Sequence, residues 1–364
     1  MDYSKLLAQA IADAAGLEVE DIASWIEVPA DETLGDYAFP CFKLAKTLRK
    51  APPAIAAEIA GKLVKPGFVS EVRVVGAYIN FFLDRVTLAR QTLEDVFEQG
   101  DAYGSSDKGA GRVVCIDYSS INIAKPFHIG HLSTTVIGNA LYRIYGFLGY
   151  KPVGINHLGD WGTQFGKLIV AYKLWGSRED IEARSITAML ELYVKFHEEA
   201  EKDPALDEQA RLWFKKIEDG DEEALSIFNW FKELTLKEVG KIYDLLGVHF
   251  DSYAGESFYN DKMQPVIDEL KEKGLLEFSE GAYVVRLGDD LPPCIVLKSD
   301  GATLYSTRDL AAAFYRKKTY NFHKCLYVVA YQQNLHFKQV FKVIELMGYE
   351  WAKDLEHVAF GMVS

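Results

Sequence analysis

The 364-residue chain is poor in cysteine, and its four cysteines lie far apart in the sequence. They are Cys41, Cys115, Cys294 and Cys325, and no two of them have Cys-x-x-Cys spacing. This disfavours a zinc ribbon and a disulfide framework, and it fits a reducing cytoplasm. The chain also lacks a continuous apolar run of membrane-spanning length and a secretory signal. We therefore expect a cytoplasmic protein with no membrane partner.

Net positive charge is missing as well, because the formal charge is -13 at pH 7. This is the wrong sign for a protein that coats nucleic acid nonspecifically. A local basic surface can still bind a specific RNA, and many of the acidic residues fall between Glu179 and Glu223, away from the motifs described below. Apolar residues make up 49% of the chain, which is enough for a sizeable core.

The length of the chain predicts two domains. Residues 1–105 are typical of a small α+β domain, with helical spacing near the start and two β-rich runs, 72–75 and 78–83, divided by Gly76. The glycine- and serine-rich stretch 104–111 is the best candidate for a linker. Residues 106–364 then form the second domain.

Strands and helices alternate in the second domain. The apolar runs 113–118, 152–156, 324–330 and 357–362 predict core strands, with helices between them. This alternation predicts an α/β fold with a doubly wound, Rossmann-type parallel sheet. Residues 177–247 are charged and helical in pattern, so we expect them to form a helical insertion on the surface.

The segment 122–131 lies between the first core strand and its helix, where a doubly wound sheet binds nucleotides. The N-terminus of the helix attracts phosphate, and Gly130 lets a nucleotide lie close to the backbone. His128 and His131 are three residues apart, so both rings can face one ligand and donate hydrogen bonds to phosphate oxygens. Two ordinary surface histidines or a metal site are the alternatives. No third ligand has suitable spacing, so we expect no tightly bound metal.

Residues 128–131, His-Ile-Gly-His, match the signature of class I aminoacyl-tRNA synthetases. Four longer stretches resemble the arginyl members of that class: 117–131, 156–166, 304–310 and 331–337. The resemblance implies a Rossmann-type catalytic domain and an arginine-tRNA ligase. Such an enzyme uses ATP with Mg2+ to convert L-arginine into arginyl-adenylate, and then transfers the arginyl group to the 3' end of tRNA(Arg).

The resemblance also assigns roles to individual residues. It assigns catalysis to Lys125, His128 and His131, and ATP binding to His128, Gly130, His131, Gln332 and His336. It assigns the arginine pocket to Asp117, Ser119, Ser120, Asn122, His128, Tyr305, Asp309 and Gln333. It makes residues 1–105 the domain that grips the tRNA elbow, with Tyr78 and Asn80 as tRNA contacts.

The chemistry of a guanidinium agrees with this pocket, because the group has a fixed charge and needs carboxylates in fork geometry. Asp309 and Asp117 are suitable acceptors, and Tyr305 can pack on the planar cation. Two alternatives remain here, since Asp309 can cap the helix that follows it and Tyr305 can be a half-buried strand aromatic. Tyr78 and Asn80 can equally be one face of an amphipathic strand.

Residues 361–364 resemble the approach to the second class signature, a lysine-rich loop, which in the family precedes an anticodon-binding domain. That loop and that domain do not follow in this sequence, so we expect this chain to charge tRNA weakly or not at all by itself. We also expect a monomer. Two other functions remain as alternatives. One is a truncated, non-catalytic paralogue that binds arginine or tRNA. The other is a free-standing adenylyltransferase, although such enzymes usually lack an N-terminal tRNA domain.

Overall fold

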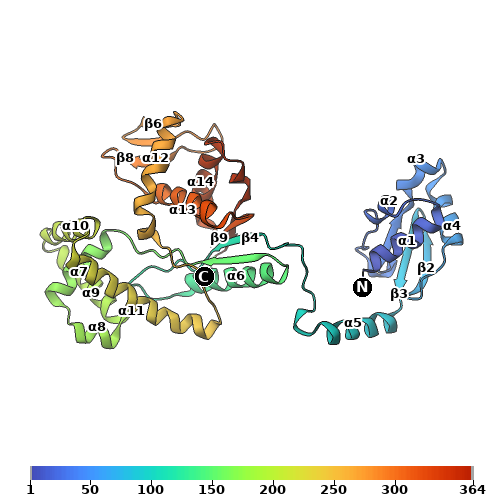
Figure 1. Ribbon diagram of the computed structural model, residues 1–364, viewed down its shortest axis with the longest axis horizontal. Helices are drawn as coiled ribbons and strands as arrows, with labels where there is room; N and C mark the ends of the chain where they lie inside the picture. The colour runs from blue at the N-terminus through green and yellow to red at the C-terminus, as the bar shows by residue number, and fades with distance from the viewer. Residues whose placement is uncertain (1, 362–364) are drawn as a thin grey trace. The chain divides into compact units, whose positions relative to one another are not determined.

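The computed structural model describes residues 2–361 and divides into two compact units, Met1–Gly104 and Ser105–Ser364 (Figure 1). The first unit contains α1 (Tyr3–Ala15), α2 (Val19–Ala23), η1 (Glu32–Leu34), β1 (Tyr37–Pro40), η2 (Cys41–Leu44), α3 (Ala45–Leu48), α4 (Pro52–Lys62), β2 (Val69–Val75), β3 (Tyr78–Leu83), α5 (Arg85–Gln99) and η3 (Gly100–Ala102). Its antiparallel sheet has the order β1-β3-β2. Pro52 begins α4, since a proline at the first turn removes an N–H that has no helical partner.

The second unit begins with β4 (Val113–Asp117), α6 (Ile129–Phe147), β5 (Lys151–Ile155), α7 (Thr163–Trp175), α8 (Arg178–Arg184), α9 (Ile186–Ala200), α10 (Ala205–Glu218) and α11 (Glu222–Leu246). It continues with η4 (Glu256–Lys262), α12 (Met263–Glu272), β6 (Leu276–Ser279), β7 (Ala282–Val285), β8 (Cys294–Lys298), α13 (Tyr305–Tyr320), β9 (Lys324–Ala330), η5 (Tyr331–Gln333), α14 (Asn334–Leu346), η6 (Glu350–Asp354) and β10 (Leu355–Phe360). The four-stranded sheet β10-β9-β4-β5 is parallel throughout.

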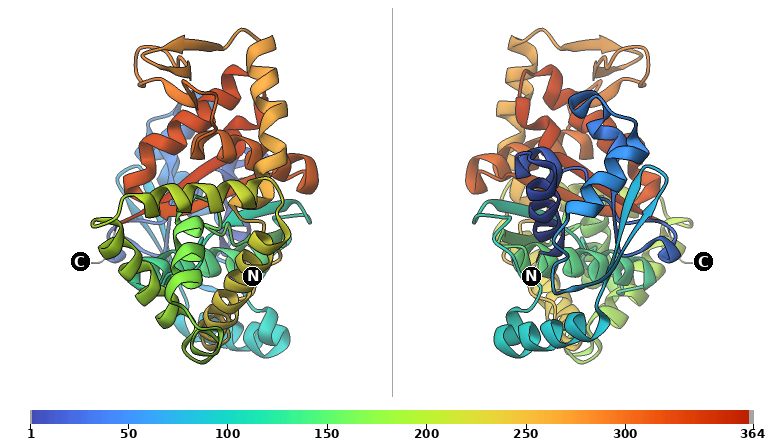
Figure 2. Two further views of the ribbon diagram at one scale, coloured as in Figure 1. Left: turned by 90° about the vertical axis from the view of Figure 1, so that its left-hand side faces the viewer. Right: turned by 90° about the vertical axis from the view of Figure 1, so that its right-hand side faces the viewer.

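Helices cover both faces of this parallel sheet (Figure 2). Alternate residues of β4 enter different cores, because successive side chains of a strand point to opposite faces. Val114 and Ile116 pack in a core that includes Phe165 of α7 and Phe231 of α11. Cys115 packs in a second core with residues of α12, α13 and α14. The predicted doubly wound, Rossmann-type fold is confirmed.

The sequence analysis did not predict the antiparallel sheet β6-β7-β8. Its strands are only four or five residues long, and one of them, β6, has no buried residue. The turn between β6 and β7 carries a local signal, since Glu280 and Gly281 both have positive φ, 50° and 79°. Two such residues in succession form a tight hairpin turn.

The stretch 104–111, predicted to be a linker, is held against the second unit from Ser106 onward. The N–H of Ser106 donates to the carbonyl of Phe147, and the N–H of Gly109 donates to that of Leu148. A Cβ at Gly109 would lie 2.1 Å from the backbone nitrogen of Tyr150, so only glycine allows this close approach.

Helices α8 to α11 occupy the region expected to be a charged helical insertion. The longest of them, α11, has 25 residues and buries one face that includes Phe228, Phe231 and Val239. Among residues 2–361, no helix combines the length and the apolar character needed to cross a bilayer. Met362–Ser364, with most of the expected approach to the second signature, lie outside the described residues.

Candidate active site

Three loops leave the parallel sheet at one edge, because β4, β5 and β9 are parallel and end there at Asp117, Ile155 and Ala330. The loops after β4 and β5 are joined by backbone hydrogen bonds, in which the Gly159 N–H donates to the carbonyl of Ile121 at 2.8 Å. A Cβ at Gly159 would lie 2.3 Å from Oδ1 of the half-buried Asn122. A side chain at Gly159 would therefore displace the Asn122 amide where these two loops meet.

His128 and His131 lie at the start of α6, and their rings are stacked with centroids 3.8 Å apart. Nδ1 of His128 accepts the Gly130 N–H at 3.1 Å, and Nδ1 of His131 accepts the His128 N–H at 3.3 Å. A neutral ring whose Nδ1 accepts carries its proton on Nε2, so each imidazole has an Nε2–H to donate. His128 is exposed, but His131 is buried, with 8% of its surface exposed. The alternative of two ordinary surface histidines is therefore excluded by His131. No three His, Cys, Asp or Glu side chains within residues 2–361 are placed to hold a metal ion.

Burial gives His131 a consequence for stability. Burial chiefly, helped by the nearby His128 and Lys125, lowers the pKa of His131 to about 4. The His131 ring therefore binds a proton near pH 6.5 in the unfolded chain but only near pH 4 in the folded chain. The free energy of unfolding thus falls as the pH decreases through this window. The expected loss is roughly 2–3 kcal/mol, measured as the free energy of unfolding at pH 7.5 and pH 4.5.

The variant His131→Gln isolates this contribution, since His157 and His357 also have lowered pKa values and titrate in the same direction. The variant should lose less stability than the original chain between the two pH values. An equal loss in both proteins would show that the His131 ring titrates normally.

The carboxylate of Asp117, at the end of β4, is fully engaged by the protein itself. Its Oδ2 accepts a hydrogen bond from Nη2 of Arg316 at 2.7 Å, and its Oδ1 accepts one from Ser120 Oγ at 2.9 Å. Arg316 is 1% exposed, and its Nε and Nη1 have no hydrogen-bond partner within residues 2–361. Burial alone would lower the pKa of the Arg316 guanidinium, but Asp117 together with Tyr259 and Tyr327 outweighs burial and holds this pKa above its usual value.

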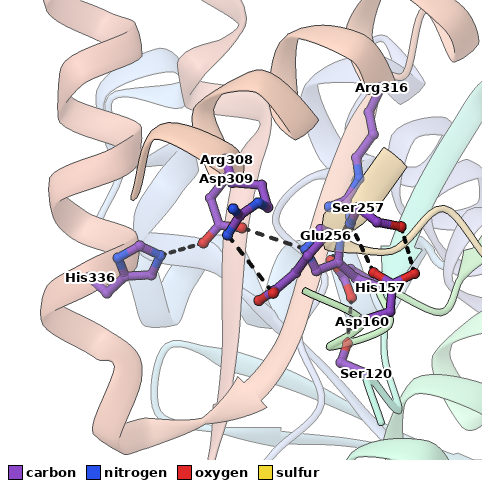
Figure 3. A network of polar contacts seen from close by, with 10 residues as sticks. Ser120, His157, Asp160, Glu256, Ser257, Arg308, Asp309, Arg316 and His336 are labelled. Atoms are coloured by element: carbon purple, nitrogen blue, oxygen red, sulfur yellow. Dashed lines mark hydrogen bonds and ion pairs between the residues drawn. The ribbon is translucent and has the colours of Figure 1, made fainter. Parts of the chain in front are cut away.

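A chain of polar contacts connects this ion pair to Asp309 on α13 (Figure 3). Arg316 Nη2 donates to Nδ1 of His157 at 3.3 Å, and Nε2 of His157 lies 3.9 Å from Asp309 Oδ1. His336, on α14, contacts Asp309 Oδ2 through Nε2 at 2.6 Å. Burial alone would raise the pKa of Asp309, but the hydrogen bond from His336 and the nearby His157 bring it below the usual value. Asp309 is therefore ionised at neutral pH while its side chain stays 25% exposed.

The first turn of α13 is fixed to β8 by two hydroxyl groups. Ser306 Oγ donates to the carbonyl of Ile295, and Thr307 Oγ1 donates to that of Val296. α13 begins at Tyr305, so Tyr305 is not a strand aromatic, and Asp309 is inside the helix and does not cap it. Both alternatives from the sequence are wrong, because the helix starts one turn earlier than the apolar run 310–313 indicated.

Two further acidic groups beside Asp309 were not predicted. Burial raises the pKa of Glu256 to about 7, although Arg308 lies 3.8 Å away and opposes the shift. Asp160 is fully buried and accepts hydrogen bonds from Lys232 Nζ at 2.6 Å and from the N–H and Oγ of Ser257 at 2.9 and 2.8 Å (Figure 3). Asp160 lies inside the stretch 156–166, so its position was signalled, whereas nothing in the sequence pattern marked Glu256.

Family comparisons match both units of the chain. Residues 92–364 match the model described as "tRNA synthetases class I (R), catalytic domain", and residues 1–83 match "Arginyl tRNA synthetase N terminal domain". The chain belongs to the arginyl-tRNA synthetase family.

Curated relatives in this family are similar over the whole chain. The "Arginine--tRNA ligase" of Alkaliphilus metalliredigens is 58% identical over 362 residues, which is 98% of this chain and 64% of the relative. The protein of the same name from Clostridium perfringens is 57% identical over 364 residues, which is 100% of this chain and 64% of the relative. The chain thus spans 64% of the length of these two relatives.

Two solved arginyl-tRNA synthetases share the fold. The structure from Plasmodium falciparum has a TM-score of 0.72 at 24% identity. The match covers 99% of this chain and 65% of the Plasmodium chain. The structure from Thermus thermophilus has a TM-score of 0.71 at 23% identity. The match covers 98% of this chain and 65% of the Thermus chain. At this level of identity the two structures support the fold alone.

The structure brings only some of the residues assigned from the family resemblance into one network. Asp117 and Ser120 connect to Asp309 through Arg316 and His157, as described above. Five other assigned side chains are exposed around the three loops: Lys125, His128, Tyr305, Gln332 and Gln333. Ser119 differs, because it is 1% exposed and its Oγ lies 2.6 Å from the hydroxyl of Tyr243. The hydroxyl of Ser119 therefore faces the protein interior.

In the first unit, Tyr78 and Asn80 line one cavity of about 390 Å³. They share a face of β3, while Ile79 and Phe81 are fully buried on the other face. Tyr78 is half-buried and Asn80 is only 2% exposed, so a role for this pair in binding tRNA stays a prediction. The cavity is lined by Glu27, Pro29, Ala30, Asp31, Leu34, Ala38, Val75, Tyr78 and Asn80.

Proposed function

We propose that this chain carries the tRNA-elbow domain (1–105) and the catalytic domain (106–364) of an arginine-tRNA ligase that works in the cytoplasm as a monomer. The observation that carries the proposal is Asp309, an ionised carboxylate that keeps a quarter of its side chain exposed one helical turn from the exposed Tyr305. A carboxylate beside an aromatic face matches a guanidinium in charge and in shape.

Residues of the neighbouring loops are suited to the rest of the substrates. The Nε2–H groups of His128 and His131 face a triphosphate at the start of α6, where the N-terminus of the helix adds positive potential. Lys125 adds an exposed cation, and the backbone at Gly130 leaves room for the nucleotide. Mg2+ would arrive on the phosphates of ATP as part of the substrate.

The reaction follows from this arrangement in two steps. The carboxylate of arginine attacks the α-phosphorus of ATP, and pyrophosphate leaves. A ribose hydroxyl of the terminal adenosine of tRNA(Arg) then attacks the carbonyl carbon of arginyl-adenylate, the arginyl ester forms, and AMP leaves. Neither step requires a protein nucleophile, so the enzyme contributes positioning and stabilisation of charge. In the first domain, the cavity beside Tyr78 and Asn80 would receive a base of the tRNA, by stacking on the ring and by hydrogen bonds to the amide.

Calorimetric titration of the 364-residue chain with L-arginine tests the proposal, with and without ATP and tRNA(Arg). We expect binding of arginine, and little or no binding of citrulline, which has the same shape without the charge. Absence of arginine binding under all of these conditions would refute the proposed function.

Exchange of pyrophosphate into ATP separates catalysis from binding alone. Exchange that requires arginine supports adenylate formation by this chain. Arginine binding without any exchange, also in the presence of tRNA(Arg), would favour the alternative of a non-catalytic chain that binds arginine or tRNA.

A further inference from the structure

One helix of the insertion, α11, makes hydrogen bonds to two of the three loops of the candidate active site, those after β4 and β5. Thr235 Oγ1 accepts the N–H of Ala124, in the loop after β4, at 3.1 Å. The hydroxyl of Tyr243 lies 2.6 Å from Oγ of Ser119 in the same loop, and it accepts Nδ2 of Asn156, after β5, at 2.9 Å. α11 also supplies the lysine that pairs with Asp160 in the second loop.

The residues that make these contacts share one buried face of α11. Thr235 is fully buried and Tyr243 is 3% exposed, with the buried Val239 between them at helical spacing. Burial raises the pKa of Tyr243 to about 12, so its hydroxyl remains protonated and able to hydrogen-bond. Lys237 and Lys241 lie on the exposed side of the helix. The polar contacts are therefore directed inward, toward the loops.

The two residues that α11 holds after β4 are in an unfavourable backbone conformation. Ser119 has φ 71° and Ala124 has φ 59°, which is the left-handed region that residues other than glycine rarely adopt. Such a conformation persists only where surrounding contacts impose it. The hydrogen bonds from Tyr243 and Thr235 reach these same two residues, and the loop leads directly to His128.

We infer that Lys232, Thr235 and Tyr243 are positioning residues, through which the helical insertion holds the loops that bind arginine and ATP. The identity of the ligands in this inference rests on the proposed function. The holding of the two loops by α11, which we call the brace, rests on the hydrogen bonds alone. In this account the insertion determines the shape of the site, and its residues touch neither substrate.

Thr235→Val tests the brace, because valine keeps the shape of threonine and removes the hydroxyl. Hydrogen exchange of the intact chain should become roughly tenfold faster for amides of residues 119–128, since the loop opens more often. The dissociation constants of arginine and ATP should rise by a similar factor. Thr235→Ser restores the hydroxyl and should restore both measurements. Thr187→Val makes the same chemical change at an exposed site on α9 and should alter neither.

Tyr243→Phe provides a second variant in case Thr235→Val does not fold. Unchanged exchange in residues 119–128 and unchanged ligand affinities in the folded variants would overturn the inference. Uniformly faster exchange over the whole second unit would also overturn it, because the contacts would then support only global stability. If the unmodified chain binds no arginine, the proposed function fails, but the exchange measurement still decides whether α11 holds the loops.

Discussion

Asp309→Asn should weaken the binding of L-arginine by about 1–3 kcal/mol, which is roughly 5- to 150-fold at 25 °C. The substitution keeps the shape of the side chain and its acceptor for His336, but it removes the charge. Because His336 and His157 keep Asp309 ionised, its full negative charge is available to a bound guanidinium at neutral pH. Titration calorimetry with arginine and with citrulline measures the change directly.

The comparison of the two ligands makes the prediction specific. The variant should lose its preference for arginine over citrulline, since the difference between the ligands is the charge that Asp309 recognises. Asp290→Asn is a suitable control, because Asp290 is exposed and lies outside the polar network. Retained preference for arginine in Asp309→Asn would assign the recognition of the guanidinium to another residue.

Arg316→Met should destabilise the protein by about 3–5 kcal/mol, because it leaves a buried carboxylate without its partner. Asp117 is 5% exposed, and Arg316 supplies the only cation bonded to it among the described residues. Urea unfolding followed by tryptophan fluorescence measures the loss. Five of the six tryptophans belong to the second unit, and only Trp25 belongs to the first, so the signal reports chiefly on the unit that contains this pair.

Removing both charges should lower the free energy of unfolding much less than removing one. In Asp117→Asn/Arg316→Met, the amide still accepts the hydrogen bond from Ser120 and no buried charge is left unpaired, so most of the stability should return. Arg286→Met breaks an exposed ion pair with Glu277 and should change stability by less than about 1 kcal/mol. If the double variant is as unstable as Arg316→Met, the loss comes from packing of the arginine side chain.

The strands that frame the site were predictable from local pattern. The runs 113–118 and 324–330 are apolar apart from Asp117 and Lys324 because both faces of a parallel strand are buried, and the structure has β4 and β9 there. The loop and helix after β4 follow from the same pattern, and His128 lies at the boundary as the N-cap residue. The antiparallel strands β6 to β8 were not predicted, since runs of four or five half-exposed residues have no distinct period.

The polar network beneath the site could not be found in this way. Arg316 is 199 residues from Asp117 in the sequence, and in the pattern it looks like a surface arginine near the end of a helix. His157 was noticed only as part of a longer matching stretch, and His336 was assigned to ATP, whereas in the structure it contacts Asp309. Pairing between distant charged residues has no local signature, because it depends on which helix faces pack together.

The order of apolar and polar residues determined by itself that this chain forms a parallel sheet with a loop and a helix after its first strand, since periodicity and helix capping act over a few neighbouring residues. Only the tertiary structure decided which carboxylate remains open. Folding pairs Arg316 with Asp117 and leaves the Asp309 side chain 25% exposed, and it brings Thr235 and Tyr243 of α11 into hydrogen bonds with the loop after β4. These outcomes depend on burial and on contacts between residues far apart in sequence, which set the charge and the shape of the site.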